Sequence, residues 1–297
     1  MKIYLSGFRG PWSQLHAIEY ELKKKKLYTH SLEHADIIYC HGINGLFDVK
    51  RKGLFNKKKI VAKVLDIPER DLGNELELIQ YRALLQKSDL ILTNTNFVSS
   101  QLKEWEILDS HVVGDPANLD WKMLDQDAIF DNSRKIDFIS YGRVSHPLKR
   151  IRLAMKAFDE LQLDDMQYHI FGPETIDHWH PDIYFNGYLT LTDLTKKLLE
   201  AKCTLAPSAF EGLGLCPIES VLCGSVPIVA DIPVMKEVWG KTIPMFKVDD
   251  KEDFKRVIMS LIDKSFKWDL SKALIRARRY TPHRVANRIL KRIEENI

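Results

Sequence analysis

Short apolar runs alternate with longer amphipathic segments along most of this chain. The runs Met1–Ser6 and Ala35–Cys40 have the continuous hydrophobicity of buried parallel strands. Between them, Gln14–Lys25 carries apolar residues three or four positions apart, which is the spacing of one helix face. The alternation of the two patterns predicts an α/β protein with parallel sheets.

The same alternation starts again in the second half of the chain. Residues 121–135 are acidic and irregular, and they are followed by a predicted strand, Ile136–Tyr141, and a predicted helix from Ile151. A restart after an irregular stretch is typical of a second domain. We therefore expect one domain over residues 1–131 and another over residues 132–281.

Composition indicates a folded protein without a membrane span. The chain has 297 residues, of which 45% are hydrophobic, and no stretch approaches the roughly 20 apolar residues that cross a bilayer. The first residues enter a strand directly and lack the features of a signal peptide. The four cysteines match neither a zinc site nor a disulfide framework, so we expect a cytoplasmic protein with reduced thiols.

Charge is distributed unevenly. The net charge is only +3, but residues 23–63 hold eleven Lys and Arg residues against three acids. We interpret the basic stretch between Gly42 and Lys59 as a loop. Segregation of this kind indicates a polyanionic partner. The candidates are an anionic membrane surface, with the protein peripheral to it, and nucleic acid.

A glycine-containing loop follows a buried run in the second half and precedes a small apolar helix. Gly212 and Gly214 allow backbone amides to approach a ligand closely, and Pro217 suits the first position of the helix. Such a junction binds anions, phosphate above all. Glu211 and Glu219 flank it, and since carboxylates repel phosphate we expect them to hold hydroxyl groups of a sugar and a ribose.

A second loop carries cations at the end of a predicted strand. Arg143 and Lys149 flank a proline-containing turn after Ile136–Tyr141. Because both follow the carboxyl end of one strand, we expect them to converge on one anion. Fixed cations at that point would stabilise charge that develops on a departing phosphate.

The two-glutamate loop, together with the segment Gly224–Ala230 that follows it, resembles the signature region of the retaining nucleotide-sugar glycosyltransferases of family 4. The resemblance is good in the C-terminal half and loose in the N-terminal half. It implies the GT-B fold, in which two Rossmann-like domains have parallel sheets that face a central cleft. It also implies that the last helix, residues 282–297, packs back on the first domain.

The resemblance assigns the donor site to the second domain. Glu211 would lie against the donor sugar, Glu219 would bind the ribose, and Arg143 and Lys149 would neutralise the diphosphate. We count Arg143, Lys149 and Glu211 as the catalytic residues. The implied donor-binding residues are Gly7, Gly10, Gly142, Gly172, Tyr188, Leu189, Gly212, Leu213, Gly214, Leu215 and Glu219. The family precedent implies no metal and no cofactor, with the nucleotide-sugar as co-substrate.

The acceptor would then lie on the first domain. His41 follows the second predicted strand, and Asp66 follows the third, so both are candidates for the acceptor side. In relatives a histidine precedes the aspartate, but here Leu65 occupies its place. The sequence leaves open which residue replaces that histidine.

The predicted activity is transfer of a sugar from a UDP- or GDP-sugar to an acceptor hydroxyl, with retention of anomeric configuration. The acceptor is a glycan, a lipid-linked glycan or hydroxymethylated DNA, as in phage-type DNA sugar transferases. The alternatives are a nucleotide-sugar epimerase and a non-catalytic sugar-nucleotide-binding protein, because one fold hosts several chemistries.

Overall fold

The computed structural model describes residues 1–7, 9, 13–66, 75–130, 133–163, 165–173, 176 and 180–297, without the side chain of Gln126. The chain divides into two compact units, one of Met1–Asn118 with Tyr280–Ile297 and one of Leu119–Arg279. The predicted boundary after residue 131 therefore falls inside the second unit. The stretch expected to be irregular contains a 3-10 turn, η2 (Trp121–Met123), and a short helix, α5 (Gln126–Phe130).

The first unit is built on a five-stranded parallel sheet in the order β1-β2-β3-β4-β5. Its strands are β1 Ile3–Gly7, β2 Ile37–His41, β3 Lys59–Val64, β4 Leu90–Thr93 and β5 His111–Val112. Ile3 also forms a parallel bridge with Tyr28, on the side away from β2. The segment around Tyr28 therefore lies on one side of β1 and β2 lies on the other, so the order of the segments reverses at β1.

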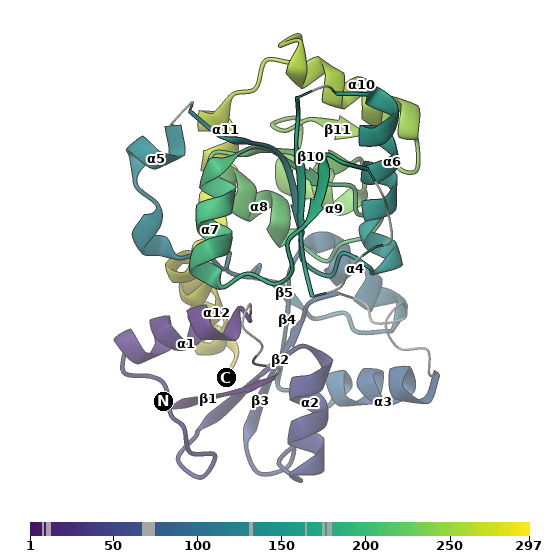
Figure 1. The fold of residues 1–297 in the computed structure, drawn as a ribbon. Coiled ribbons are helices and arrows are strands. Elements are labelled where there is room, and N and C mark those ends of the chain that lie inside the picture. Colours follow the sequence, from purple (N-terminus) through teal and green to yellow (C-terminus); the bar gives the residue numbers. More distant parts are fainter. Residues whose placement is uncertain are drawn as a thin grey trace. The chain divides into compact units, whose positions relative to one another are not determined.

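Helices cover both faces of this sheet (Figure 1). They are α1 Leu15–Lys24, α2 Gly42–Arg51, α3 Glu75–Gln86, α4 Asn96–Glu104 and α12 Pro282–Asn296. α1 and α12 share one core with the strands, and it includes Leu15, Val61 and Ile289. α2, α3 and α4 share the core on the opposite face, which includes Leu46 and Leu85. The last helix of the chain is therefore part of the first unit.

Helix α2 corrects the prediction of a basic loop after Gly42. Its two basic residues, Lys50 and Arg51, face solvent, while Leu46 and Val49 are buried. The helical spacing of these apolar residues was present in the sequence but was hidden by the basic residues around it. Gly45 lets α2 approach the sheet, since a Cβ there would lie 2.6 Å from the Ser6 carbonyl oxygen.

The second unit has a six-stranded parallel sheet in the order β11-β10-β9-β6-β7-β8. Its strands are β6 Ile136–Tyr141, β7 Tyr168–Phe171, β8 Ile183–Phe185, β9 Ala201–Ala206, β10 Val226–Ala230 and β11 Met245–Phe246. Since β9 lies on the other side of β6 from β7, the strand order reverses at β6. In open α/β sheets ligands bind at the carboxyl ends beside such a reversal.

Some helices of this unit lie between its strands in the sequence, and others follow the last strand, β11. They are η3 Pro147–Lys149, α6 Ile151–Leu161, α7 Leu191–Glu200, α8 Leu215–Leu222, α9 Pro233–Trp239, α10 Lys251–Ile262, α11 Leu270–Ala277 and η4 Arg278–Tyr280, whose last residue belongs to the first unit. α6 packs against α10 and α8 against α11. α6 is strongly amphipathic and buries Ile151, Ala154 and Phe158.

The predicted fold class is confirmed. Each unit is a parallel sheet with interleaved helices, and the solved structures described below share this architecture. Within the described ranges, no helix is both long and apolar enough to cross a bilayer.

Gly45→Ala tests the close approach of α2 to the sheet. Alanine normally stabilises a helix interior by about 1 kcal/mol relative to glycine. Here the added Cβ meets backbone, so we expect the free energy of unfolding to fall by about 1–3 kcal/mol instead. Urea denaturation measures the change, with the exposed Asn44→Ala in the same helix as the control. Stabilisation by Gly45→Ala would contradict the packing described.

Candidate functional site

Two loops meet at the strand reversal in the second unit. One follows β6 and runs from Gly142 to Arg150, and the other follows β9 and leads into α8. β6 and β9 are neighbours in the sheet. The loops are joined directly, because the Ala209 amide donates to the Leu148 carbonyl oxygen at 2.9 Å. Residues far apart in sequence are thereby held together at the carboxyl ends of the strands.

The predicted catalytic residues Lys149 and Glu211 form an ion pair across these loops. Lys149 Nζ donates to Glu211 Oε1 at 2.6 Å, and the two side chains are 26% and 16% exposed. Burial lowers the pKa of Lys149, but the Glu211 carboxylate outweighs that effect, and the pKa lies above its ordinary value. The lysine is therefore a fixed cation at neutral pH, within a partly buried site.

Arg143 supplies a second positive charge to the same place. It is exposed, and its charge lowers the pKa of Lys149. The two bases are therefore near enough to repel each other. A dianionic ligand between them would relieve that repulsion, which is the arrangement expected for a diphosphate.

The glycine loop leads into α8 as a buried turn. Gly212, Leu213 and Gly214 are buried, and Gly214 caps the helix with φ +80°. This left-handed backbone conformation favours glycine, because side chains are strained there. The N-cap residue Gly214 has no side chain to cap α8, and the first amides of a helix, which have no partner within the helix, favour an anion.

Helix α8 begins earlier than the sequence suggested. It starts at Leu215, so Pro217 is the third helical residue rather than the first, and Glu219 lies in the second turn rather than the first. The third position still belongs to the first turn, where a missing N–H costs no helical hydrogen bond. The interpretation of the loop as an anion site is unaffected.

Glu219 is held by a residue that sequence reasoning missed. The Tyr141 hydroxyl donates to Glu219 Oε2 at 2.7 Å and also lies 3.1 Å from the Cys216 carbonyl oxygen. Burial, together with the negative charge of Glu219, raises the pKa of Tyr141 well above its ordinary value. The sequence could have indicated Tyr141, because it is the last residue of the predicted strand Ile136–Tyr141 and therefore lies at the edge of the sheet where ligands bind.

Three glycine turns lie side by side at the same edge. The Gly142 amide donates to the Phe171 carbonyl oxygen at 3.0 Å, and the Gly172 amide donates to that of Gly187 at 2.9 Å. A Cβ at Gly172 would lie 2.6 Å from the Gly142 carbonyl oxygen, whereas nothing lies within 4 Å of a Cβ at Gly142. The predicted residues Tyr188 and Leu189 follow Gly187, and Tyr188 is 46% exposed.

The predicted residues of the first unit are not all brought together. Gly7 contacts the end of β2, since a Cβ there would lie 2.8 Å from the His41 carbonyl oxygen. His41 is buried on the face that α1 and α12 cover, 3.6 Å from Asp115. Asp66 acts on the opposite face, where burial and the Asp66 charge raise the pKa of Tyr81. Gly10 lies outside the described residues.

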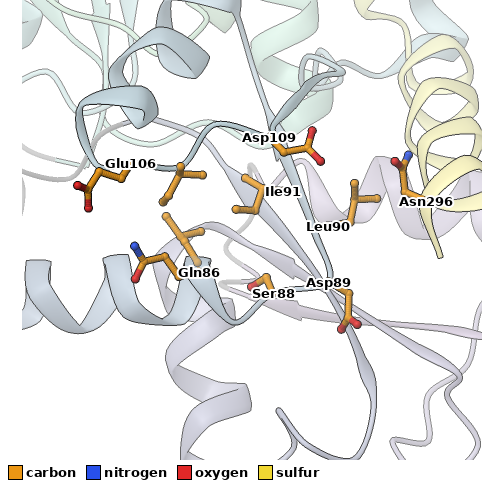
Figure 2. Close-up of a pocket in the computed structure, with 10 residues that line it drawn as sticks. Gln86, Ser88, Asp89, Leu90, Ile91, Glu106, Asp109 and Asn296 are labelled. Atoms are coloured by element: carbon orange, nitrogen blue, oxygen red, sulfur yellow. The ribbon is translucent and has the colours of Figure 1, made fainter.

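A hollow at the amino-terminal end of β4 does not resemble an anion site (Figure 2). Its acids, Asp89, Glu106 and Asp109, lie on different sides of the hollow and are each paired separately. Across the described chain, no group of three or more His, Cys, Asp or Glu side chains is placed to hold a metal ion.

The second unit matches a known family model. Residues 135–264 match the model described as Glycosyl transferases group 1. A segment of 85 residues is 35% identical to the serotype-specific mannosyltransferase WbdA of Escherichia coli. That match covers 28% of this chain and only 10% of the length of the mannosyltransferase.

Solved glycosyltransferase structures share the whole fold. Anabaena HepE, in complex with UDP and glucose, has a TM-score of 0.78 at 14% identity, covering 99% of this chain and 100% of its own. The lipopolysaccharide outer core galactosyltransferase WaaB has a TM-score of 0.71 at 14% identity and full coverage of both chains. Sucrose-phosphate synthase of Thermosynechococcus elongatus has a TM-score of 0.72 at 14% sequence identity, and the match covers 94% of this chain and 77% of the synthase chain. At this identity the likeness establishes the GT-B fold.

Tyr141→Phe tests the bond that holds Glu219. The substitution removes the hydroxyl from a buried carboxylate, so we expect the free energy of unfolding to fall by about 1–3 kcal/mol at neutral pH. Chemical denaturation measures the loss, with Tyr184→Phe on the exposed side of β8 as the control. Equal stability of the two variants would show that Glu219 does not depend on Tyr141.

Proposed function

We propose that this protein is a glycosyltransferase that moves a sugar from a nucleotide diphosphate sugar to an acceptor hydroxyl. The observation that supports this most directly is the Lys149–Glu211 pair, which joins a cationic loop to a glycine loop at the strand reversal. The match of residues 135–264 to Glycosyl transferases group 1 covers both loops.

The donor binds to the second unit in this proposal. The diphosphate lies between Arg143, Lys149 and the first amides of α8, and Lys149 exchanges its contact with Glu211 for one with a phosphate oxygen. Glu211 is then left to accept hydrogen bonds from sugar hydroxyls. Glu219, fixed by Tyr141, accepts hydrogen bonds from the ribose. These cations offset the diphosphate charge in place of a metal ion.

Transfer proceeds with retention of configuration by displacement on one face of the sugar. The bond from the anomeric carbon to the phosphate oxygen breaks as the bond to the acceptor oxygen forms, and the acceptor proton passes to the leaving phosphate. Negative charge grows on that phosphate in the transition state. The fixed cations and amides are therefore the groups that raise the rate.

The acceptor we propose is a glycan or a lipid-linked glycan. WbdA and WaaB are named for mannosyl and galactosyl transfer, the second to lipopolysaccharide. The first unit has an open hollow of about 830 Å³ whose lining includes the bases Lys50 and Arg51 and the acids Asp48 and Glu77, and a polar lining of this kind suits the hydroxyl groups of a saccharide. Activity on hydroxymethylated DNA that falls steeply with salt would contradict the choice of a glycan.

A screen of nucleotides by thermal shift tests the donor. Tight binding of one nucleotide diphosphate raises the melting temperature by mass action, and we expect UDP or GDP and the matching sugar to do so. Formation of a sugar isomer from the donor, without an acceptor, would show an epimerase instead.

Arg143→Met tests the cationic loop. Arg143 is exposed, so the fold is retained, and removal of one charge that stabilises the leaving group costs about a hundredfold or more in kcat. Nucleotide release from the donor that binds in the screen is measured. Arg152→Met, at an exposed position on α6, is the matched control. Equal turnover of the two variants would remove Arg143 from the reaction.

A further inference from the structure

A group of buried polar side chains lies at the carboxyl ends of the strands in the first unit. We name these residues the β-edge cluster. Its members are Tyr39, His41, Lys63, Asn94 and Asp115, each at most 6% exposed. They come from the ends of β2, β3 and β4 and from the turn after β5. Neither composition nor charge along the sequence singled out Lys63 or Asp115.

The cluster continues the apolar face that α1 and α12 cover. Tyr39, Val61, Leu92 and Val113 point into that core. Side chains two positions further along a strand point to the same face, and these positions are polar: His41, Lys63, Asn94 and Asp115. The switch from apolar to polar therefore occurs at the same level in four neighbouring segments, at the edge where ligands of α/β sheets bind.

Lys63 is a buried cation in this cluster. It is 0% exposed, and its ammonium donates to Asn94 Oδ1, whose amide nitrogen in turn donates to the Leu65 carbonyl oxygen at 2.9 Å. Burial lowers the pKa of Lys63 to about 7, against a raising effect of Asp115 and a further lowering by Arg288 on α12. Asp115 is thus the charge that favours the ammonium form.

Several polar atoms of the cluster have no hydrogen-bond partner within the described part of the chain. They are Tyr39 Oη, His41 Nδ1 and Nε2, and Asp115 Oδ1. Buried polar atoms are almost always paired, and exceptions gathered in one place indicate a missing ligand or water. His41 Nε2 and Asp115 Oδ2 are 3.6 Å apart, so a single hydroxyl group could contact both residues.

We propose that Asp115 and His41 bind a hydroxyl group of the acceptor sugar, and that Lys63 is a positioning residue that compensates the charge of Asp115. This inference rests on the proposed function. A hydroxyl group donates one hydrogen bond and accepts others, so it satisfies a carboxylate and an imidazole N–H together. A phosphate would be repelled by Asp115, and an apolar group would leave these atoms unpaired.

The charges around Lys63 set a pH dependence. The titratable and charged groups that face it are His41 from β2, Asp115 from the turn after β5 and Arg288 from α12; Tyr39 lies beside His41 and Asp115. Lys63 loses its proton as pH rises through about 7, which leaves the Asp115 charge uncompensated. Acceptor use should therefore fall over that range, and this step should be absent in Lys63→Met.

The experiment compares Asp115→Asn, Lys63→Met and the double variant with the wild type. The probe acceptors are methyl α-mannopyranoside and methyl α-glucopyranoside, and donor hydrolysis without a probe is measured in parallel. We expect kcat/KM for the probe to fall about a hundredfold in Asp115→Asn, with donor hydrolysis and nucleotide affinity unchanged. If the wild type itself neither hydrolyses the donor nor transfers its sugar to a probe, the result contradicts the proposed function as a whole and not this site in particular.

The double variant separates binding from stability. Each single substitution leaves one buried charge without its opposite charge, whereas the double variant removes both charges. We therefore expect the melting temperature of the double variant to return toward that of the wild type. Probe transfer should stay low. If the double variant recovered both probe transfer and stability, Asp115 and Lys63 would be a structural charge pair and would not bind the acceptor. An equal fall of probe transfer and donor hydrolysis in Asp115→Asn would indicate a contact with the donor sugar and would overturn the assignment to the acceptor. A structure with a probe bound elsewhere and only an ordered water at Asp115 would overturn it too.

Discussion

The ion pair between Lys149 and Glu211 is the interaction on which the account of this protein depends. It joins the loop after β6 to the loop after β9 at the point where strand order reverses. Without a ligand, each residue keeps the other from being a buried, uncompensated charge. A diphosphate that takes the lysine frees the carboxylate for sugar hydroxyls, so one exchange of partners couples recognition of the two halves of a donor.

The two units place charge at their ligand edges in different ways. In the second unit, Arg143 and Lys149 follow the same strand and are partly open to solvent, which suits a dianion. In the first unit, Lys63 and Asp115 are buried together, and the unpaired atoms around them suit a neutral hydroxyl group. In the proposed function, this difference in burial and net charge corresponds to the different chemistry of a nucleotide donor and a saccharide acceptor.

The sequence predicted the α/β class because buried parallel strands are continuous apolar runs. It also predicted that the loop after Ile136–Tyr141 and the two-glutamate loop serve one site, but it did not predict the ion pair that joins Lys149 to Glu211 across them. It missed helix α2, because the basic residues Lys50, Arg51 and Lys52 at its end led the segment to be interpreted as a loop, and it placed the start of α8 two residues late. Tyr141, Lys63 and Asp115 could not be predicted from local pattern, because their importance comes from burial and from neighbours distant in the sequence. Strand alternation could have placed Lys63 on an inward face, but not its partners.

A crystal structure of the protein with the nucleotide diphosphate that raises its melting temperature would show directly whether Lys149 exchanges Glu211 for a phosphate. We expect Lys149 Nζ at about 2.8 Å from a phosphate oxygen, with Glu211 released from the lysine and the phosphates against the first turn of α8. A nucleotide bound elsewhere, with the Lys149–Glu211 contact intact, would contradict this expectation.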